Sequence, residues 1–426
     1  MHAPTLHKSC SYPDAVSTPS TSRGVTTPDP ILVGDEHELL VTEVAHGGHM
    51  VARLGSFVVF VRHALPGETV RARITHVRST FAHADVVAVL RAHPSRRTAP
   101  CPAAGVCGGC DFLHASEDLQ RAMKTSVLTQ ALIRHGRLEP ERAQALIGAG
   151  VESLGRDFGW RTRMHYRVWG GSVALKKYRS DEVVDVRDCV IADPIGHAAA
   201  VRAAEHVQPG SDLWMATGLE GIVVAESSDL ATVRHSIIVD GTQLEFETTI
   251  DGFWQVHPLL AQTLVDTVLS WGDPKPGETW WDLFAGVGPF AAAIGLRVGA
   301  GGRVHAVESS APAVRSARVA LAGMPWVRCH LGDVGRWLGR PGRGRPQGVI
   351  VDPPRAGLGK SLVNALANAG PELIVMVACD PVALGRDIAL LAARGFNLER
   401  LRAWDAFPQT HHMEAIATFR SDDRIS

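Results

Sequence analysis

From residue 275 onward, short apolar runs alternate with alanine-rich stretches of helical character. The runs occupy residues 279–284, 303–308, 327–331, 348–352 and 373–379. Apolar strands separated by helices are typical of a parallel sheet that is covered by helices on both faces. The pattern predicts an α/β fold of the Rossmann-like, doubly wound type, whose ligands bind at the carboxyl ends of the strands.

The region before residue 275 has different patterns. Residues 36–92 contain short alternating strands separated by turn signals such as Pro66-Gly67, which predicts a small OB-like β-barrel. Residues 115–150 have helical periodicity with Ser116 as the expected N-cap, and residues 160–250 return to strand patterns. The central part of the chain is therefore expected to be a mixed α+β domain.

These patterns predict the domain organisation. We expect the barrel over residues 31–95, the central α+β domain over 96–255 and the Rossmann-like domain over 256–426. Near the C-terminus, "LRAWDAFPQTHHMEAIATFR" predicts two strands around a Pro-containing loop. Half of residues 1–30 are Ser, Thr or Pro, which is typical of a disordered tail.

Composition favours a cytoplasmic protein. No apolar run reaches the length of about 18 residues that a transmembrane helix needs. The N-terminal residues also lack the apolar core of a signal peptide. The net charge of −1 does not indicate a nucleic-acid partner, although a local basic patch can bind phosphates. One such cluster lies between residues 161 and 179, where a solvated sheet face is an equally good interpretation.

The segment "WWDLFAGVGPF" at residues 280–290 reads as a strand, a glycine turn and the start of a helix. Gly286 and Gly288 let the backbone approach a ligand closely. A glycine turn alone is a weak signal, but the "DLFAG" context favours S-adenosylmethionine over NAD. Glu308 ends the next strand, where a carboxylate can bind a ribose diol, and Asp333 follows the third strand, where it could meet adenine.

Asp352 follows the fourth strand and begins the segment "DPPRAG". Enzymes that methylate amino groups usually have an aromatic residue after the two prolines, which stacks on the base. Here that position is Arg355. The segment therefore argues against methylation of an exocyclic nitrogen.

Cys379 lies at the carboxyl end of the fifth strand and is followed by Asp380-Pro381. This is the edge of the sheet where chemistry is expected. A cysteine in a buried strand is usually inert when nothing else marks it. A thiol beside a methyl-donor site is nevertheless what methylation of a pyrimidine carbon requires.

Three further cysteines, Cys101, Cys107 and Cys110, are bunched with the spacing C-x5-C-x2-C, and Cys189 is a plausible fourth ligand. Four thiolates suit either zinc or an iron–sulfur cluster, and the spacing does not separate the two. Seven cysteines in a chain that looks intracellular do not suggest disulfides.

Five ordered motifs give the chain a specific resemblance: "FWQVHP", "DLFAGVGPF", "DPPRAG", "VACDPVALGRD" and "FPQTHHMEA". Together they resemble the RNA uracil-5-methyltransferase family, and "VARLGSFVVFVRHALPGETVRARI" resembles its TRAM domain, an OB-like barrel that binds RNA. The resemblance runs from about residue 36 to 420. It implies an enzyme that forms 5-methyluridine in RNA with S-adenosylmethionine as methyl donor.

The resemblance also implies residue roles. Cys379 would be the nucleophile that attacks uracil C6, and Glu414 the base that removes the C5 proton. The residues implied for binding the cofactor or the base are Gln255, Phe284, Gly286, Gly288, Glu308, Asp333 and Asp352. In several family members, cysteines in the pattern of Cys101, Cys107, Cys110 and Cys189 hold a [4Fe–4S] cluster, which we therefore favour over zinc.

A barrel combined with a cysteine cluster resembles the branch that modifies ribosomal RNA of the 23S type, although transfer RNA stays a possible substrate. Neither a membrane nor an obligate protein partner is indicated. A non-catalytic RNA-binding protein with the same fold is the alternative from another class, and the pair of Cys379 and Glu414 argues against it.

Three positions depart from the family's usual pattern: Asp380 and His257 each stand where Asn is usual, and Pro289 also replaces an Asn. Asp380 has the clearest expected consequence. Its negative charge beside the thiol would raise the pKa of Cys379 unless a cation compensates.

Overall fold

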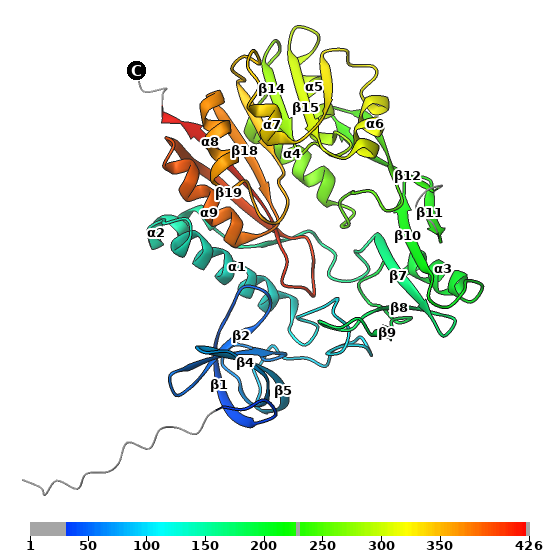
Figure 1. Cartoon of the computed structure of the whole chain (residues 1–426), viewed down its shortest axis with the longest axis vertical. Coiled ribbons are helices and arrows are strands. Elements are labelled where there is room, and N and C mark those ends of the chain that lie inside the picture. The colour runs from blue at the N-terminus through cyan, green and yellow to red at the C-terminus, as the bar shows by residue number, and fades with distance from the viewer. Residues whose placement is uncertain (1–30, 227–230, 423–426) are drawn as a thin grey trace, which may run out of the picture.

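The computed structural model describes residues 31–226 and 231–422. The predicted disordered tail, residues 1–30, lies outside the described residues. Three parts follow one another in space: a barrel at one end, a central sheet to one side, and a large sheet with its helices at the other end (Figure 1). None of the described helices combines the length and the apolar character that crossing a membrane requires.

The predicted barrel is confirmed. Its strands are β1 (Glu36–Val44), β2 (Met50–Leu54), β3 (Phe57–Arg62), β4 (Thr69–Val77) and β5 (Phe81–Arg91). They close in the order β1-β2-β3-β5-β4. Alternate side chains of β4, namely Val70, Ala72 and Ile74, point into the barrel core, which is the period of two that the sequence shows.

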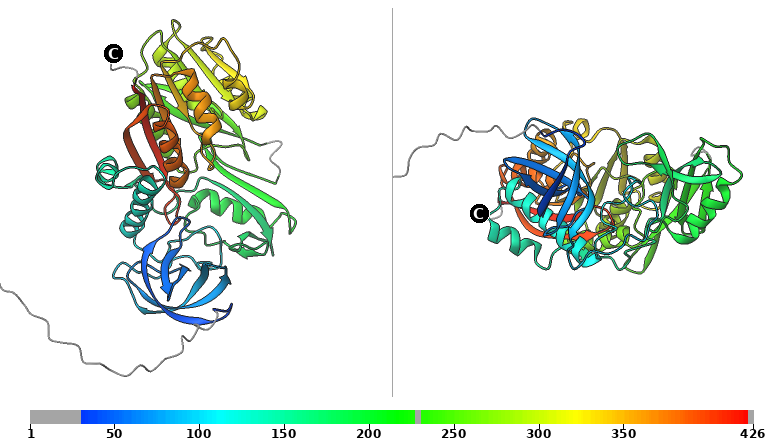
Figure 2. Two further views of the ribbon diagram at one scale, coloured as in Figure 1. Left: turned by 60° about the vertical axis from the view of Figure 1, so that its left-hand side comes forward. Right: turned by 90° about the horizontal axis from the view of Figure 1, so that it is seen from below.

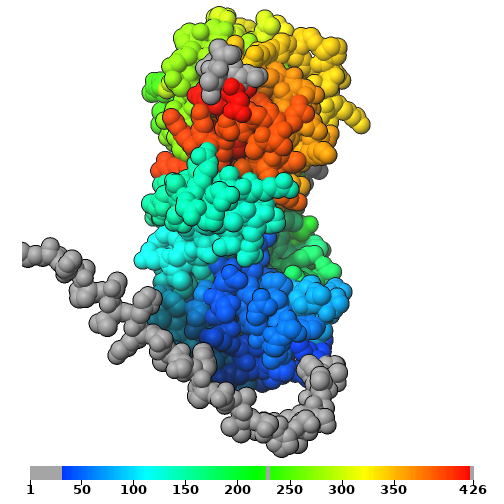
Figure 3. All heavy atoms as spheres, turned by 90° about the vertical axis from the view of Figure 1, so that its left-hand side faces the viewer, coloured from blue at the N-terminus to red at the C-terminus, as the bar shows by residue number. Residues whose placement is uncertain are grey.

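Two helices connect the barrel to the large sheet. Ser116 caps α1 (Glu117–Arg134) as predicted, because its hydroxyl accepts from the Leu119 N–H. Together with α2 (Pro140–Ile147), α1 packs on the C-terminal sheet, and the short strand β6 (Glu152–Ser153) pairs with that sheet's edge. These elements form a teal band between barrel and sheet in Figure 3. They fall within the segment predicted as the central domain, whose boundaries stay a prediction.

The central sheet has the order β11-β10-β7-β8-β9. Its strands are β7 (Arg163–Trp169), β8 (Ser172–Lys176), β9 (Val183–Asp185), β10 (Asp212–Gly218) and β11 (Gly221–Ala225). One helix, α3 (Pro194–Ala204), packs on it, and the hairpin of β12 (Thr232–Val239) and β13 (Thr242–Thr249) leads from it to the large sheet. Figure 2 shows this sheet beside the barrel rather than stacked on it.

The large sheet has the order β16-β15-β14-β17-β18-β20-β19-β6. Its remaining strands are β14 (Thr279–Leu283), β15 (Arg303–Glu308), β16 (Val327–Leu331), β17 (Gly348–Val351), β18 (Leu373–Ala378), β19 (Phe396–Asp405) and β20 (Glu414–Ser421). All five predicted parallel strands are confirmed to within one residue at each end, and so is the final hairpin.

Helices cover both faces of this sheet, as the alternation predicts. The helices are α4 (Leu260–Gly272), α5 (Pro289–Val298) and α6 (Ala311–Ala320) on one face, and α7 (Val334–Leu338), α8 (Gly359–Ala369) and α9 (Pro381–Ala392) with α1 on the other. Within β18, Val375 and Val377 face the first layer, whereas Ile374 and Met376 face the second. A strand buried on both faces needs apolar residues throughout, which explains the unbroken apolar runs.

Candidate active site

A cavity of about 1450 Å³ opens at the carboxyl ends of the parallel strands. It is lined by most of the catalytic and cofactor residues expected from the sequence, namely Gln255, Phe284, Gly286, Glu308, Asp352, Cys379 and Glu414. Two expected residues, Gly288 and Asp333, are not in its lining. The carboxyl-edge position follows the general rule for open α/β sheets.

The glycine loop forms one wall of the cavity. Phe284 has a φ of 66°, which is uncommon for a residue with a side chain, and Gly286 and Gly288 have φ values of 56° and 89°. A Cβ at Gly286 would meet no atom within 4 Å, so the backbone faces open space there. A Cβ at Gly288 would lie 3.1 Å from Leu321 Cδ1, so this glycine lets the loop pack against the end of α6.

The two carboxylates after β15 and β16 have different partners. Glu308 Oε2 accepts from the Gly286 N–H at 3.0 Å, and its Oε1 accepts from the Ser310 N–H at 2.7 Å. Glu308 therefore ties the glycine loop to the start of α6 at the cavity wall. Asp333 instead caps α7 by accepting from the Arg336 N–H at 2.9 Å.

The register of the sheet brings Cys379 and Glu414 together. β18 and β20 are antiparallel neighbours in which Ala378 pairs with Ala415. Continuing that register by one residue puts Cys379 opposite Glu414. Side chains at opposite positions have Cβ atoms about 4.5–5.5 Å apart. The two residues expected to share the reaction therefore lie at the same place on adjacent strands.

Negative charge gathers around the thiol. The pKa of Cys379 is raised to about 11, mainly by burial and then by Glu414 and Asp352, while Arg355 opposes them. Burial also raises the pKa of Glu414, with Asp352 adding to the effect and Arg355 opposing it, and burial raises the pKa of Asp352 to about 7. Arg355 lines the same cavity, and its positive charge favours the thiolate of Cys379 and the carboxylate of Glu414.

Glu414→Gln should lower the pKa of Cys379, because it removes a like charge that opposes thiolate formation. The measurement is the pH dependence of alkylation of the Cys379 peptide, followed by mass spectrometry. The midpoint should move to lower pH. An unchanged or higher midpoint would contradict the charge coupling, and the peptide of Cys329 in the same protein is the internal control.

Asp380, which departs from the family pattern, has two local partners. Asp380 caps α9 by accepting from the Ala383 N–H at 2.7 Å, and it faces His46 Nε2 at 3.2 Å. Burial alone would raise its pKa, but the hydrogen bonds from His46 and Ala383 outweigh burial, and the pKa of Asp380 lies below its usual value. The barrel thus reaches the cysteine loop through the residue that departs from the family pattern.

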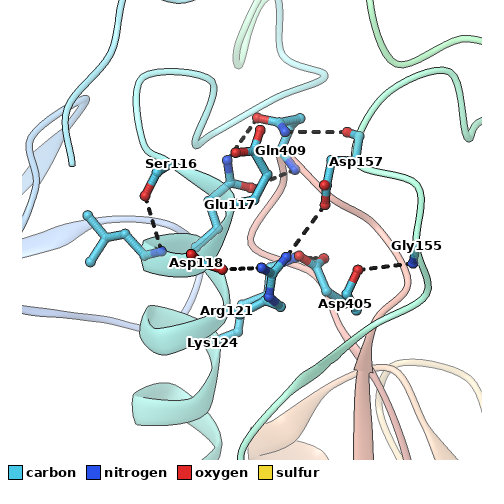
Figure 4. A network of polar contacts seen from close by, with 12 residues as sticks. Ser116, Glu117, Asp118, Arg121, Lys124, Gly155, Asp157, Asp405 and Gln409 are labelled. Carbon is cyan, nitrogen blue, oxygen red and sulfur yellow. Dashed lines mark hydrogen bonds and ion pairs between the residues drawn. The ribbon is translucent and has the colours of Figure 1, made fainter.

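A second loop, residues 406–413, connects β19 to Glu414 and is held by N-terminal segments (Figure 4). Lys124 of α1 pairs with Asp405 and donates to the Phe407 carbonyl, and both charged side chains are 1% exposed. Gln120 of α1 accepts from the Gln409 N–H at 2.9 Å. The loop places Phe407, Thr410 and His412 in the cavity wall, so α1 helps to shape the site.

Lys124→Met should destabilise the protein by about 3–5 kcal/mol, because it leaves the buried Asp405 charge unpaired. Adding Asp405→Leu should recover most of that loss, since an apolar pair needs no compensation. Urea unfolding measures both effects. Breaking the exposed pair of Arg420 and Glu399 on the same hairpin is the control and should cost about 0–1 kcal/mol. A Lys124→Met loss no larger than this control would contradict the argument.

The four clustered cysteines do come together. Cys101, Cys107, Cys110 and Cys189 line one small cavity of about 30 Å³, and burial raises the pKa of Cys107, Cys110 and Cys189. Within residues 31–226 and 231–422, however, no three His, Cys, Asp or Glu side chains are arranged to hold a metal ion. The remaining lining is mostly apolar, with Arg161 as the charged exception.

Several residues of the site were not anticipated. Thr410, His412 and Phe407 line the cavity, and Lys124, Gln120 and His46 support its loops. All of the first three lie inside the motif "FPQTHHMEA", so the motif itself was the available signal. The supporting residues come from distant segments of the chain, and no sequence motif marked them.

Comparison with known proteins agrees with this architecture. The TRAM domain model matches residues 30–87, and the tRNA (Uracil-5-)-methyltransferase family model matches residues 345–420. An RNA methyltransferase of Streptomyces avermitilis is 37% identical over 90% of this chain and 98% of its own length. The 23S rRNA (uracil(1939)-C(5))-methyltransferase of Shewanella halifaxensis is 28% identical over 89% of this chain and 95% of its own length.

Among solved structures, the tRNA (uracil-54, C5)-methyltransferase of Pyrococcus abyssi, in complex with S-adenosyl-L-homocysteine, matches with a TM-score of 0.64. The two are 20% identical, and the match covers 90% of this chain and 99% of the other, which shows a shared fold. With the extended match to the Streptomyces relative and the two family models, this chain belongs to the RNA uracil-5-methyltransferase family, whose methyl donor is S-adenosylmethionine.

Proposed function

We propose that this enzyme methylates C5 of uracil through a covalent bond between Cys379 and C6, with Glu414 as the base. The observation that carries the proposal is the position of the two residues. Cys379 directly follows β18, Glu414 begins the adjacent β20, and both line one cavity with the glycine loop. A thiol and a carboxylate at that separation can act on neighbouring ring atoms.

The chemistry needs both groups because uracil C5 is a weak nucleophile. Cys379 Sγ bonds to C6, and the C5–C6 π electrons move onto C5 and the O4 carbonyl as an enolate. C5 would then bond to the methyl carbon of the donor as the bond from that carbon to the donor's sulfonium sulfur breaks, and the donor would leave as a neutral thioether. Glu414 removes the proton that remains on C5, the C5–C6 double bond re-forms, and Sγ leaves with its electron pair. Each residue thus acts at a different atom, and covalent catalysis divides one difficult step into easier ones.

Bound S-adenosylmethionine would supply an electrophilic methyl group. The residues present fit such a ligand: open space over Gly286, a carboxylate at Glu308 and the side chains of Phe284 and Gln255 share the cavity. Glu308 is already oriented by backbone N–H groups, so little reorganisation is needed for it to accept from ribose hydroxyls. Asp333 and Gly288 would act less directly, through the ends of α7 and α6.

For the substrate, we favour uridine in ribosomal RNA of the 23S type, modified in the cytoplasm. Two relatives that match about nine-tenths of this chain are 23S ribosomal RNA uracil methyltransferases, from Shewanella halifaxensis and Chromohalobacter salexigens. The closed barrel with its TRAM match supports an RNA longer than the nucleotide in the cavity.

Mapping 5-methyluridine in ribosomal and transfer RNA from a deletion strain tests the substrate. One uridine of 23S ribosomal RNA should lose its C5 methyl group, and the purified enzyme should restore it in vitro. Loss confined to transfer RNA would replace the ribosomal assignment. No loss in either RNA would contradict the function.

We also propose that Cys101, Cys107, Cys110 and Cys189 hold a [4Fe–4S] cluster. Support comes from four thiols around one cavity whose lining is otherwise mostly apolar, an environment suited to a cluster held by cysteine thiolates. The cluster would join the segment after the barrel to the central sheet, since Cys107 and Cys189 lie on separate segments next to that sheet. Its role would be structural.

Protein purified without air should be brown, with about four irons per chain and no stoichiometric zinc. Cys110→Ser should lose the colour and most of the iron, whereas Cys329→Ser, which changes a cysteine on β16, should keep both. Colourless wild-type protein with one zinc per chain would contradict the cluster.

A further inference from the structure

Five arginines gather near His305 of β15 and His330 of β16, at the outer edge of the large sheet, and we call them the arginine surface: Arg303, Arg318, Arg328, Arg340 and Arg343. All are exposed except Arg343, which is half-buried and stacks 3.8 Å over the Trp337 ring. Among the described residues, none of the five forms an ion pair. By contrast, Lys176 and Lys177 of the cluster singled out in the sequence do pair with carboxylates.

The five arginines surround one feature, the pair of His305 on β15 and His330 on β16. The ring nitrogens of the two histidines are 2.9 Å apart. Burial lowers the pKa of both histidines, and the neighbouring arginines lower it further, so that the pKa of His305 falls to about 4. The histidines are therefore neutral near pH 7, and the positive charge of the surface is carried by the arginines.

The nearest carboxylates are engaged elsewhere. Between residues 303 and 345 the chain has eight arginines and only two carboxylates, Glu308 and Asp333. Glu308 accepts from backbone N–H groups at the cavity, and Asp333 caps α7. In a chain whose net charge is −1, this concentration of unpaired arginine is a local excess that a polyanion would neutralise.

The arginine surface is continuous with the active-site cavity through α6. Pro312, Ala313 and Ser316 of this helix line the cavity. At its other end, Arg318 lies beside β16, where it donates to the Cys329 carbonyl at 3.5 Å. With a rise of 1.5 Å per residue, Arg318 lies only about 3 Å further along the axis of α6 than Ser316, so this helix joins the surface to the cavity wall.

We infer that the arginine surface binds backbone phosphates of RNA that extends beyond the target uridine. The inference rests on the proposed function and adds to it a substrate class, an RNA long enough to reach past α6. Arginine suits this role because its planar guanidinium bonds phosphate oxygens in a bidentate manner. Contacts to phosphates alone would strengthen binding without reading sequence.

The test compares Arg328→Gln/Arg340→Gln with a control of equal charge loss on α1 and the turn after it, Arg134→Gln/Arg137→Gln. All four arginines are exposed, so neither double variant should disturb the fold. Two RNAs are used without methyl donor: an unmodified 23S ribosomal RNA transcript, and a short fragment that holds only the modified uridine and its neighbours.

For the transcript, Kd should rise by about tenfold in the first variant, and the slope of log K against log salt should fall by about 1.4–1.8 in magnitude. For the short fragment, Kd should not change, and kcat at saturating transcript should equal that of wild type. An unchanged transcript Kd and slope, or equal weakening for both RNAs, would overturn the inference. Methylation of both RNAs by wild type reports separately on the proposed function.

Discussion

Cys379→Ala is expected to lower kcat/KM for methyl transfer by at least about 10⁴-fold. Without the thiolate, no bond forms at C6, and C5 never gains the electron density that attack on a methyl group requires. The remaining cavity can still bind both substrates, because Gln255, Phe284 and Glu308 are unaltered. KM and the affinity for methyl donor should therefore stay close to the wild-type values while kcat falls.

The assay is transfer of labelled methyl groups to RNA, with a denaturing gel that detects covalent complexes between protein and RNA. Cys379→Ala should give neither product nor complex. Cys329→Ala is the matched control, since Cys329 is also a half-buried thiol of the large sheet but lies on β16. Substantial product from Cys379→Ala would contradict covalent catalysis, even if the family membership stands.

The large sheet could be predicted well from the sequence because the apolar residues of each strand indicate that the strand is buried. A run such as residues 373–378 is apolar at every position, as a strand buried on both faces requires. The cavity's position then followed from a general rule about carboxyl ends. The glycine loop, Glu308 and the motif "DPPRAG" after β17 could be predicted because each follows a strand that the sequence identifies.

The proximity of Cys379 and Glu414, in contrast, could not be predicted from the pattern of either strand. It depends on β20 lying antiparallel to β18, with Ala415 beside Ala378. Sequence periodicity shows that each strand exists but not which strands are neighbours or in what register. The resemblance to a family supplied the pair, and the register gives its physical reason.

The supports of the site could not be predicted from local pattern at all. Lys124 reads as a surface residue of an amphipathic helix, because lysines are almost never fully buried unless paired. Its partner Asp405 lies 281 residues away. Likewise, the surroundings of Asp380 could not be predicted, because its partner His46 comes from the barrel. Such contacts follow from tertiary packing alone.

Glu414→Gln should separate the two halves of the reaction. Cys379 can still attack C6, and C5 can still take a methyl group, because neither step uses the Glu414 carboxylate. The C5 proton then has no base to receive it, so release of the product should slow by about 10²–10⁴-fold. A covalent complex of protein and methylated RNA should accumulate, up to one RNA per active site.

Labelled methyl donor makes this outcome measurable, since the label should migrate with the protein on a denaturing gel. Glu399→Gln, on the exposed part of β19, should release labelled RNA at the wild-type rate. If Glu414→Gln instead released methylated RNA normally, another group would be the base. If it formed no complex at all, Glu414 would act before methyl transfer.

The pH dependence of product release tests independently whether Glu414 is the base. Glu414 accepts a proton only when ionised, and burial together with Asp352 raises its pKa above the usual value. Product release by wild type should therefore increase as pH rises through that raised pKa. The glutamine variant has no group to ionise at this position, so its slow release should lose this dependence. If product release by the variant still increased with pH, another group would be responsible for the increase. Asp352 is the first candidate, because it lines the same cavity and burial raises its pKa to about 7.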